Sequence, residues 1–131
     1  MPAINAHWAS LDGYKPSSWL TIPSIQLELP VLRVEPFHGV IEQPLGWAAL
    51  YRDDFGVHNG YSRAAARLRP GAEVDYGSQT FYISKVLVLS KKEAAVFALS
   101  HRTLITCTDD WQRNVVYVLE QKISLPHLLA R

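Results

Sequence analysis

The sequence has a single cysteine, Cys107, among 131 residues. One thiol excludes an internal disulfide, and no cluster of cysteines and histidines at ligand spacing indicates a structural zinc site. No apolar run approaches the roughly 18 residues that a membrane-spanning helix needs. Residues 1–5 also lack the basic region and following apolar region of a signal peptide. The sequence as written therefore predicts either a soluble protein or one whose membrane anchor has been removed.

The sequence also lacks a marked excess of either positively or negatively charged residues. Thirteen basic and twelve acidic residues give a formal net charge of +1, and the two signs are interspersed. Nucleic-acid binding usually requires a basic patch, so we expect no nucleic-acid partner. We expect no metal or other cofactor either. The apolar content of 48% and the length fit one ordinary globular domain with a single core.

Most of the chain has the composition of short β-strands joined by turns. Pro23 and Pro30 interrupt the first apolar segments, which predicts edge strands or bulges there. Polar and apolar residues alternate after residue 73, and residues 91–97 fit one or two turns of helix. We expect a mainly β fold with one or two short helices, divided into an N-terminal helix or arm (1–18), a β domain (19–123) and a C-terminal tail (124–131).

The lone cysteine lies in a predicted hairpin. Two β-rich runs, 103–107 and 113–118, flank the polar turn 108–112. If the two strands pair, Cys107 and Arg113 can face the same small volume. A neighbouring positive charge favours a thiolate, and a guanidinium can hold a developing oxyanion. The alternative from the residues alone is a small buried apolar side chain, which is common for a free cysteine.

The run Thr103–Cys107, followed by Arg113, resembles the TLxTC signature of the sortases, the cysteine transpeptidases of bacterial cell surfaces. Residues 22–31 are similar to the opening strands of that family, and residues 68–74 resemble its Leu-x-Pro-Gly turn. Residues 42–47 are similar to a segment of class E and related sortases. The resemblance implies a closed or nearly closed antiparallel β-barrel of about eight strands.

The resemblance also implies the site residues. Cys107 would be the nucleophile that forms a thioester. His58 falls where the family's catalytic histidine is expected and would protonate the leaving amine. Arg113 would hold the substrate carbonyl or the oxyanion. Thr106 and Trp47 are the candidate substrate-binding residues.

The segment before His58 departs from the family pattern. Residues 53–57 replace the usual apolar strand, and the stretch from Trp47 to His58 is several residues short. His38 is a second candidate for the histidine. Two alternatives to the enzyme follow: a sortase-shaped barrel that has lost catalysis and serves as a binding or assembly module, and an unrelated small barrel with a buried thiol.

The partners and location come from the resemblance alone. It implies a sorting-signal peptide of the Leu-Pro-x-Thr-Gly kind, or its Ala-for-Pro variant, as the substrate. The acceptor would be an amine of a cell-wall precursor or a pilin lysine. The implied location is the extracytoplasmic surface of a bacterial cell.

Overall fold

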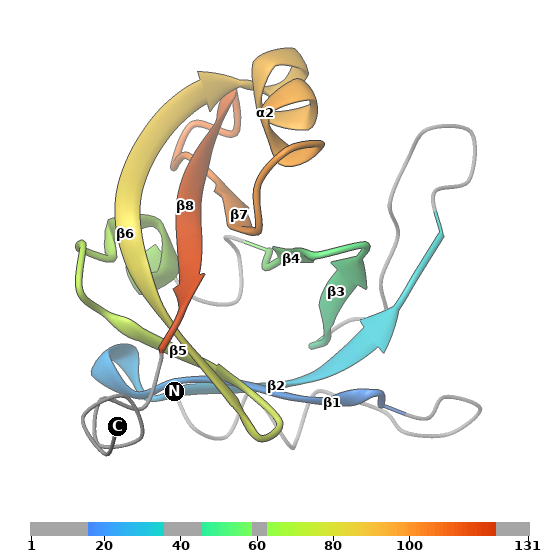
Figure 1. Ribbon diagram of the computed structural model, residues 1–131. Coiled ribbons are helices and arrows are strands. Elements are labelled where there is room, and N and C mark those ends of the chain that lie inside the picture. Colours follow the sequence, from blue (N-terminus) through green and yellow to red (C-terminus); the bar gives the residue numbers. More distant parts are fainter. Residues whose placement is uncertain (1–15, 36–45, 59–62, 123–131) are drawn as a thin grey trace, which may run out of the picture.

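The computed structural model describes residues 16–35, 46–58 and 63–122. Eight strands form a closed barrel with short helical segments (Figure 1), which confirms the expected fold. The strands are β1 (Ser18–Ile22), β2 (Leu27–Arg33), β3 (Ala48–Tyr51), β4 (Asp54–Gly56), β5 (Glu73–Tyr76), β6 (Gln79–Ser90), β7 (Thr103–Cys107) and β8 (Arg113–Gln121). The helical segments are the 3₁₀ turns η1 (Pro23–Ile25) and η2 (Arg63–Arg67) and the helix α2 (Lys91–Ala98).

Some expectations fall outside the described residues. These are most of the N-terminal arm, the C-terminal tail, His38 and the segment similar to class E sortases as far as residue 45. Among the residues that the structure describes, no helix is both long enough and apolar enough to cross a bilayer.

The strands follow the order β1-β2-β3-β4-β7-β8-β6-β5 around the barrel. Six of the eight neighbouring pairs are antiparallel, as expected. The pairs β2–β3 and β4–β7 are parallel, so the barrel is mainly but not wholly antiparallel. Parallel neighbours need a long connection, and between β4 and β7 it comprises η2, β5, β6 and α2.

Local sequence explains where the helical segments begin. Pro23 opens η1, where its missing N–H leaves no donor unpaired. Ser90 caps α2: its Oγ accepts from the Glu93 N–H, and the Glu93 carboxylate accepts from the Ser90 N–H, each at 3.1 Å. The helix expected at 91–97 is confirmed, and residues 63–67 form the 3₁₀ turn η2.

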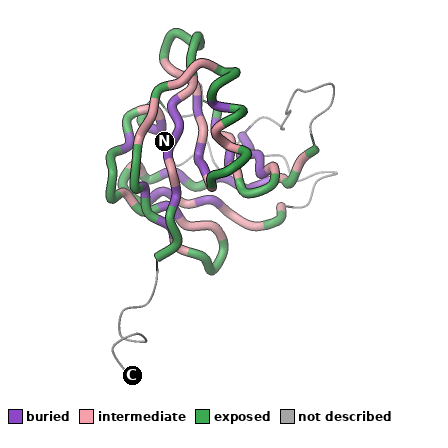
Figure 2. Tube along the Cα trace, turned by 45° about the horizontal axis from the view of Figure 1, so that its top comes forward, coloured by how far each residue is buried: buried purple, intermediate pink, exposed green. Residues whose placement is uncertain are grey.

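The barrel interior holds the hydrophobic core. Figure 2 shows buried, intermediate and exposed stretches along the chain. Burial alternates with the strand period at the start of β6, where Phe81 and Ile83 are buried and Tyr82 and Ser84 are exposed. The core includes at least one residue from every strand. Its largest fully buried members include Tyr117, Phe81, Leu20, Ile22 and Leu29.

Tyr117 is a fully buried residue of β8 whose hydroxyl group joins the barrel wall to η2. The hydroxyl donates to the carbonyl oxygen of Ala65 at 2.6 Å and accepts from the Leu68 N–H at 3.0 Å. Two backbone groups of a short 3₁₀ segment are thereby satisfied inside the protein. This hydroxyl fixes the segment that follows residues 59–62 against the β8 strand.

We expect Tyr117→Phe to lower the free energy of unfolding by about 1–3 kcal/mol, because it leaves the Ala65 carbonyl and the Leu68 N–H buried without their partner. Urea denaturation measures the change. The matched control is Tyr82→Phe, at an exposed tyrosine of β6, which should change stability by less than about 0.5 kcal/mol. Equal effects of the two substitutions would contradict the assigned role.

The three-residue strand β4 is fastened to β7 at its first residue. The hydroxyl of Thr103, which is fully buried, donates to Asp54 Oδ1 at 2.6 Å. Burial raises the pKa of the Asp54 carboxyl above its ordinary value of 3.8, and the Thr103 hydrogen bond opposes that effect. The nearby charge of Asp53 adds to the rise. Asp54 therefore provides an acceptor that Thr103 needs, at the cost of a half-buried charge.

We expect the contribution of Asp54 to the free energy of unfolding to rise as the pH falls from neutral through its raised pKa, because the folded state binds this proton more tightly than the unfolded chain does. Asp54→Asn keeps an acceptor for Thr103 and removes the charge. It should raise stability at neutral pH and abolish this contribution to the pH dependence.

Asp54→Ala is the contrasting variant. It leaves the buried Thr103 hydroxyl without its acceptor and should lower stability by about 1–3 kcal/mol. Urea titrations of the three proteins between pH 7 and pH 4 separate the charge from the hydrogen bond. The interpretation fails if the Asn and Ala variants behave alike.

Candidate functional site

His58 and Cys107 lie at matching ends of the parallel strands β4 and β7. The register pairs Phe55 with Leu104 and Gly56 with Ile105, and the Val57 N–H continues the ladder by donating to the Ile105 carbonyl at 3.0 Å. Extending this register by two residues beyond the end of β4 leads us to expect His58 beside Cys107. Because neighbouring strands lie about 4.8 Å apart, we expect the two residues to be adjacent at one edge of the barrel.

The same register turns both side chains outward. Phe55 and Leu104 belong to the core, as does Val57, so the intervening positions face away from it. His58 is exposed and Cys107 is half-buried. The imidazole and the thiol therefore share the outer face of the barrel, where a ligand can approach.

Asn114 is the residue directly opposite Cys107 across the β7–β8 hairpin. The Cys107 Sγ lies 3.9 Å from Asn114 Oδ1, with the thiol as donor. The expected pairing of the two strands is confirmed, but sequence analysis did not single out Asn114. Counting outward from the turn would have found it, because positions 108 and 113 close the turn and 107 and 114 are the next pair.

Arg113 lies one residue nearer the turn than Asn114. Its backbone N–H donates to Thr108 Oγ1 at 3.2 Å, and its carbonyl accepts from the Thr108 N–H at 2.9 Å. Its side chain is exposed, and strand alternation directs it to the face opposite that of Asn114. A role for Arg113 at Cys107 thus requires the long side chain to reach around the end of the strand, and that role stays a prediction.

The turn after Cys107 is closed by polar contacts. Asp110 Oδ1 accepts from the Thr108 hydroxyl at 2.6 Å and from the Gln112 N–H at 3.0 Å, and these bonds, that of Thr108 first, lower the pKa of the Asp110 carboxyl. Asp109 forms an ion pair with Arg67 of η2. The turn is held both internally and against the segment that follows His58 along the chain.

Trp111, in the same turn, contacts His58. The two ring centroids are 4.8 Å apart and the planes meet at 64°, an edge-to-face arrangement. This contact joins the turn that follows Cys107 to the residue that lies beside Cys107. No sequence signal marked Trp111, because an aromatic residue in a turn has no characteristic spacing.

The two residues expected to bind substrate lie in the interior. Trp47 has no exposed surface and Thr106 is 3% exposed. The Thr106 hydroxyl has no hydrogen-bond partner among the residues that the structure describes. Neither side chain forms part of the open face, so their roles toward a substrate stay predictions.

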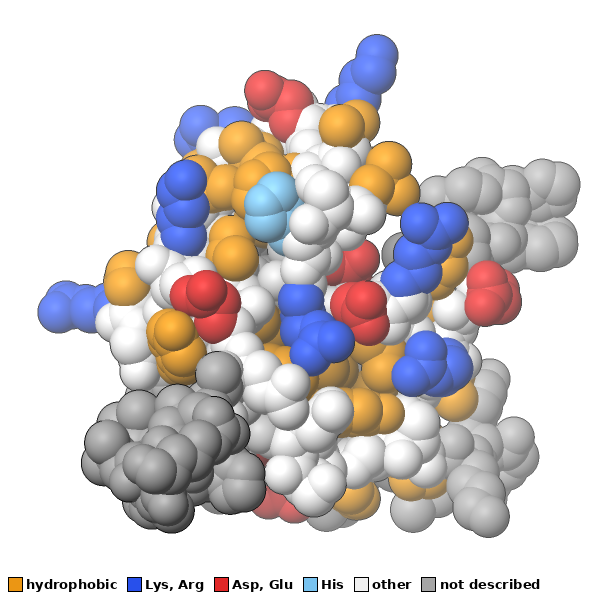
Figure 3. All heavy atoms as spheres, viewed as in Figure 1, with side chains coloured by type: hydrophobic (Ala, Val, Ile, Leu, Met, Phe, Trp, Pro, Cys, Tyr) orange, Lys and Arg blue, Asp and Glu red, His pale blue; other side chains and the backbone are white. Residues whose placement is uncertain are grey.

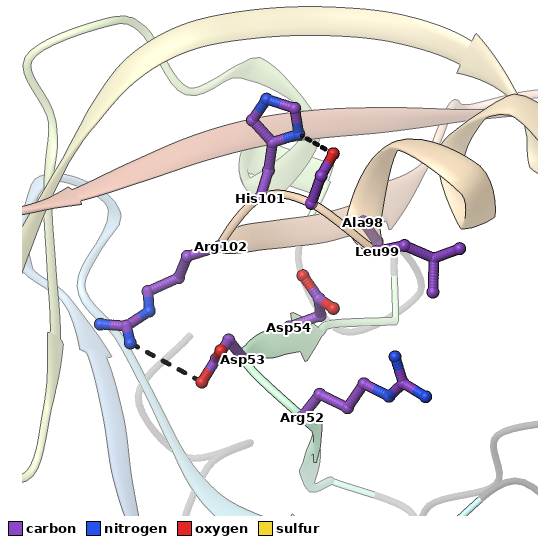
Figure 4. A pocket seen from close by; sticks show the side chains of 8 residues that line it. Arg52, Asp53, Asp54, Ala98, Leu99, His101 and Arg102 are labelled. Atoms are coloured by element: carbon purple, nitrogen blue, oxygen red, sulfur yellow. Dashed lines mark hydrogen bonds and ion pairs between the residues drawn. The ribbon is translucent and has the colours of Figure 1, made fainter.

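A second polar region lies at the opposite ends of β4 and β7. A hollow of about 570 Å³ is lined by Arg52, Asp53, Asp54, His101 and Arg102, with the end of α2 along one side (Figure 4). Arg102 pairs with Asp53 at 3.6 Å. His101 stacks on Phe97 of α2, with ring centroids 3.8 Å apart. These residues are separated from Cys107 by the length of β7.

Charged side chains of both signs are spread over the face of the molecule in Figure 3. Within 16–35, 46–58 and 63–122, no three residues of the histidine, cysteine and carboxylate types lie close enough together to hold a metal ion. Among the contacts of the Cys107 thiol is the hydrogen bond to the side-chain amide of Asn114.

Comparison with solved structures identifies the architecture. Sortase D5 of Clostridium perfringens matches with a TM-score of 0.62 at 13% identity, over 81% of this chain and 78% of that one. Sortase C of C. perfringens, solved with the C-terminal cell wall sorting motif, matches with 0.61 at 14%, over 81% and 70%. Sortase A of Listeria monocytogenes matches with 0.58 at 17%, over 82% and 90%.

The chain has the sortase fold. No protein-family model matches the sequence, and no curated protein matches it significantly. The similarity is therefore one of structure, at identities that show the fold alone. The matched sortases above are of classes A, C and D, and the similarity to class E stays a prediction.

Proposed function

We propose that this protein is a sortase-like cysteine transpeptidase with Cys107 as its nucleophile. The observation that supports the proposal is the parallel pairing of β4 with β7, whose register, extended two residues beyond β4, predicts His58 beside Cys107 on the outer face of the barrel. A thiol and an imidazole in this relation are the two groups that acyl transfer requires. The sortase fold supports the same reaction class.

In the proposed reaction, the Cys107 thiolate attacks the carbonyl carbon of a peptide bond. The tetrahedral intermediate collapses as the C–N bond breaks, and His58 gives its proton to the departing amine. The product is a thioester on Cys107. An incoming amine then attacks the thioester and forms a new amide, its proton returns to His58, and the thiolate leaves.

Arg113 is the proposed donor to the oxyanion. A guanidinium can present two parallel N–H groups to an oxygen. Its exposed position at the start of β8 leaves the side chain room to approach a substrate bound over Cys107. Asn114, opposite the thiol, is the neighbouring group that could supply a neutral donor instead.

The proposed substrate is a sorting-signal peptide of the Leu-Pro-x-Thr-Gly kind or its Ala-for-Pro variant. The structural match to a sortase C solved with a cell wall sorting motif supports testing this class first. The proposed acceptor is an amine of a cell-wall precursor or a pilin lysine. Such a reaction belongs at the extracytoplasmic surface of a bacterial cell.

Cleavage of fluorogenic sorting peptides, with hydroxylamine as the acceptor, tests the proposal. We expect Cys107→Ala to abolish turnover, because the acyl-enzyme cannot form. His58→Asn, which removes the acid, should lower kcat by roughly 10²- to 10⁴-fold. The matched control is His101→Asn, at an exposed histidine on the opposite rim, which should leave turnover unchanged.

The thioester itself is detectable by mass spectrometry as a peptide adduct on Cys107 that hydroxylamine releases. A wild-type protein that binds a sorting peptide and never forms the adduct would be the binding or assembly module instead. A thiol that resists alkylation in the folded state would point to the unrelated barrel with a buried cysteine.

The source of the oxyanion donor is decided by a second pair of variants. If Arg113 supplies it, Arg113→Lys should lower kcat by roughly tenfold or more, because an ammonium group lacks the two parallel donors. Asn114→Ala should then change kcat much less. If Asn114→Ala lowers kcat more than Arg113→Lys does with the same peptides, the oxyanion donor is Asn114 and not Arg113.

A further inference from the structure

Trp111 has a backbone conformation that tryptophan rarely adopts. Its φ is +64°, in the left-handed region that glycine and asparagine favour. Its N–H donates to the Thr108 carbonyl at 2.9 Å, so the conformation is part of the closed turn. Hairpin loops of this length commonly include a left-handed residue, and that residue is usually glycine. The chain thus has a tryptophan at a position where glycine, which lacks a side chain, would adopt the backbone conformation with the least strain.

The indole at this strained position does not go into the core. It is 45% exposed, and its ring meets the imidazole of His58 edge to face at 4.8 Å. Strained backbone that surrounding contacts hold in place is concentrated at functional sites. Here the residue with the left-handed backbone is also the one whose aromatic ring contacts His58.

We propose that Trp111 is a positioning residue, whose indole holds the His58 imidazole at the edge where Cys107 reacts. This inference rests on the proposed function. An exposed histidine at a strand end has several rotamers open to it, and an aromatic neighbour favours those that keep the rings in contact. Correct orientation of an acid relative to the leaving group is a large part of its catalytic value.

The turn that carries Trp111 is fixed by hydrogen bonds and an ion pair. The Thr108 and Gln112 bonds to Asp110 close the turn internally, and the ion pair between Asp109 and Arg67 fastens it to η2. None of these contacts uses the indole of Trp111. Replacing the side chain can therefore leave the turn intact, so function and stability are separable at this position.

Trp111→Gly makes the separation testable. Glycine relieves the left-handed strain, so the variant should melt at the same temperature as the wild type or higher. Its kcat for sorting-peptide cleavage should nevertheless fall roughly two- to tenfold, with KM nearly unchanged. Trp111→Phe keeps a ring and should recover most of the lost kcat.

A merely structural tryptophan gives the opposite pattern. Activity would then follow stability, and Trp111→Gly would be at least as active as the wild type. That result would overturn the proposal. A rise in KM with unchanged kcat would overturn it as well, because it would assign the indole to substrate binding.

A measurement without substrate separates this inference from the proposed function. The ring protons of His58, assigned in NMR spectra by their loss in His58→Asn, should carry a ring-current shift from the indole. The shift should disappear in Trp111→Gly and persist in part in Trp111→Phe. An unchanged shift in Trp111→Gly would refute the positioning role, whether or not the wild type cleaves peptides.

Discussion

The parallel pairing of β4 with β7 is the constraint on which the candidate site depends. β4 has only three residues, yet its register decides which side chains meet. A shift by one residue would turn His58 toward the core and bring Val57 beside Cys107 on the outside. The Asp54–Thr103 hydrogen bond at one end and the Val57–Ile105 bond at the other oppose such a shift. The chemistry at Cys107 thus begins with the pairing of two short strands.

Contacts from distant parts of the chain then hold the open edge together. The buried Tyr117 hydroxyl fixes η2 to β8, and the Arg67–Asp109 ion pair joins η2 to the turn after Cys107. The indole of Trp111, in the same turn, contacts His58 and so links the turn to the residue that follows Val57. Each contact links segments more than forty residues apart in sequence. These three contacts together connect β8, η2, the turn after Cys107 and His58.

Local patterns predicted much of the fold and some of the site. The hairpin around Cys107, the alternation after residue 73 and the helix at 91–97 all follow from neighbouring residues. The parallel contact of β4 could not be predicted, because residues 53–57 are short and mixed in polarity and their partner lies about fifty residues away. A family motif selected His58, and its position relative to Cys107 follows only when the β4–β7 register is extended beyond Gly56.

Departures from local preference are informative at the two ends of β7. Arg52 also has a positive φ, +57°, in the two-residue turn between β3 and β4, so a residue other than glycine has a left-handed backbone near each end of β7. The far end is otherwise well satisfied, since Thr103 bonds to Asp54. Near Cys107, the Thr106 hydroxyl is buried without a partner among the described residues, and Trp111 is strained. Both this buried hydroxyl and the strained backbone lie within a few residues of Cys107. Such unfavourable features are more typical of functional sites than of residues chosen only for packing.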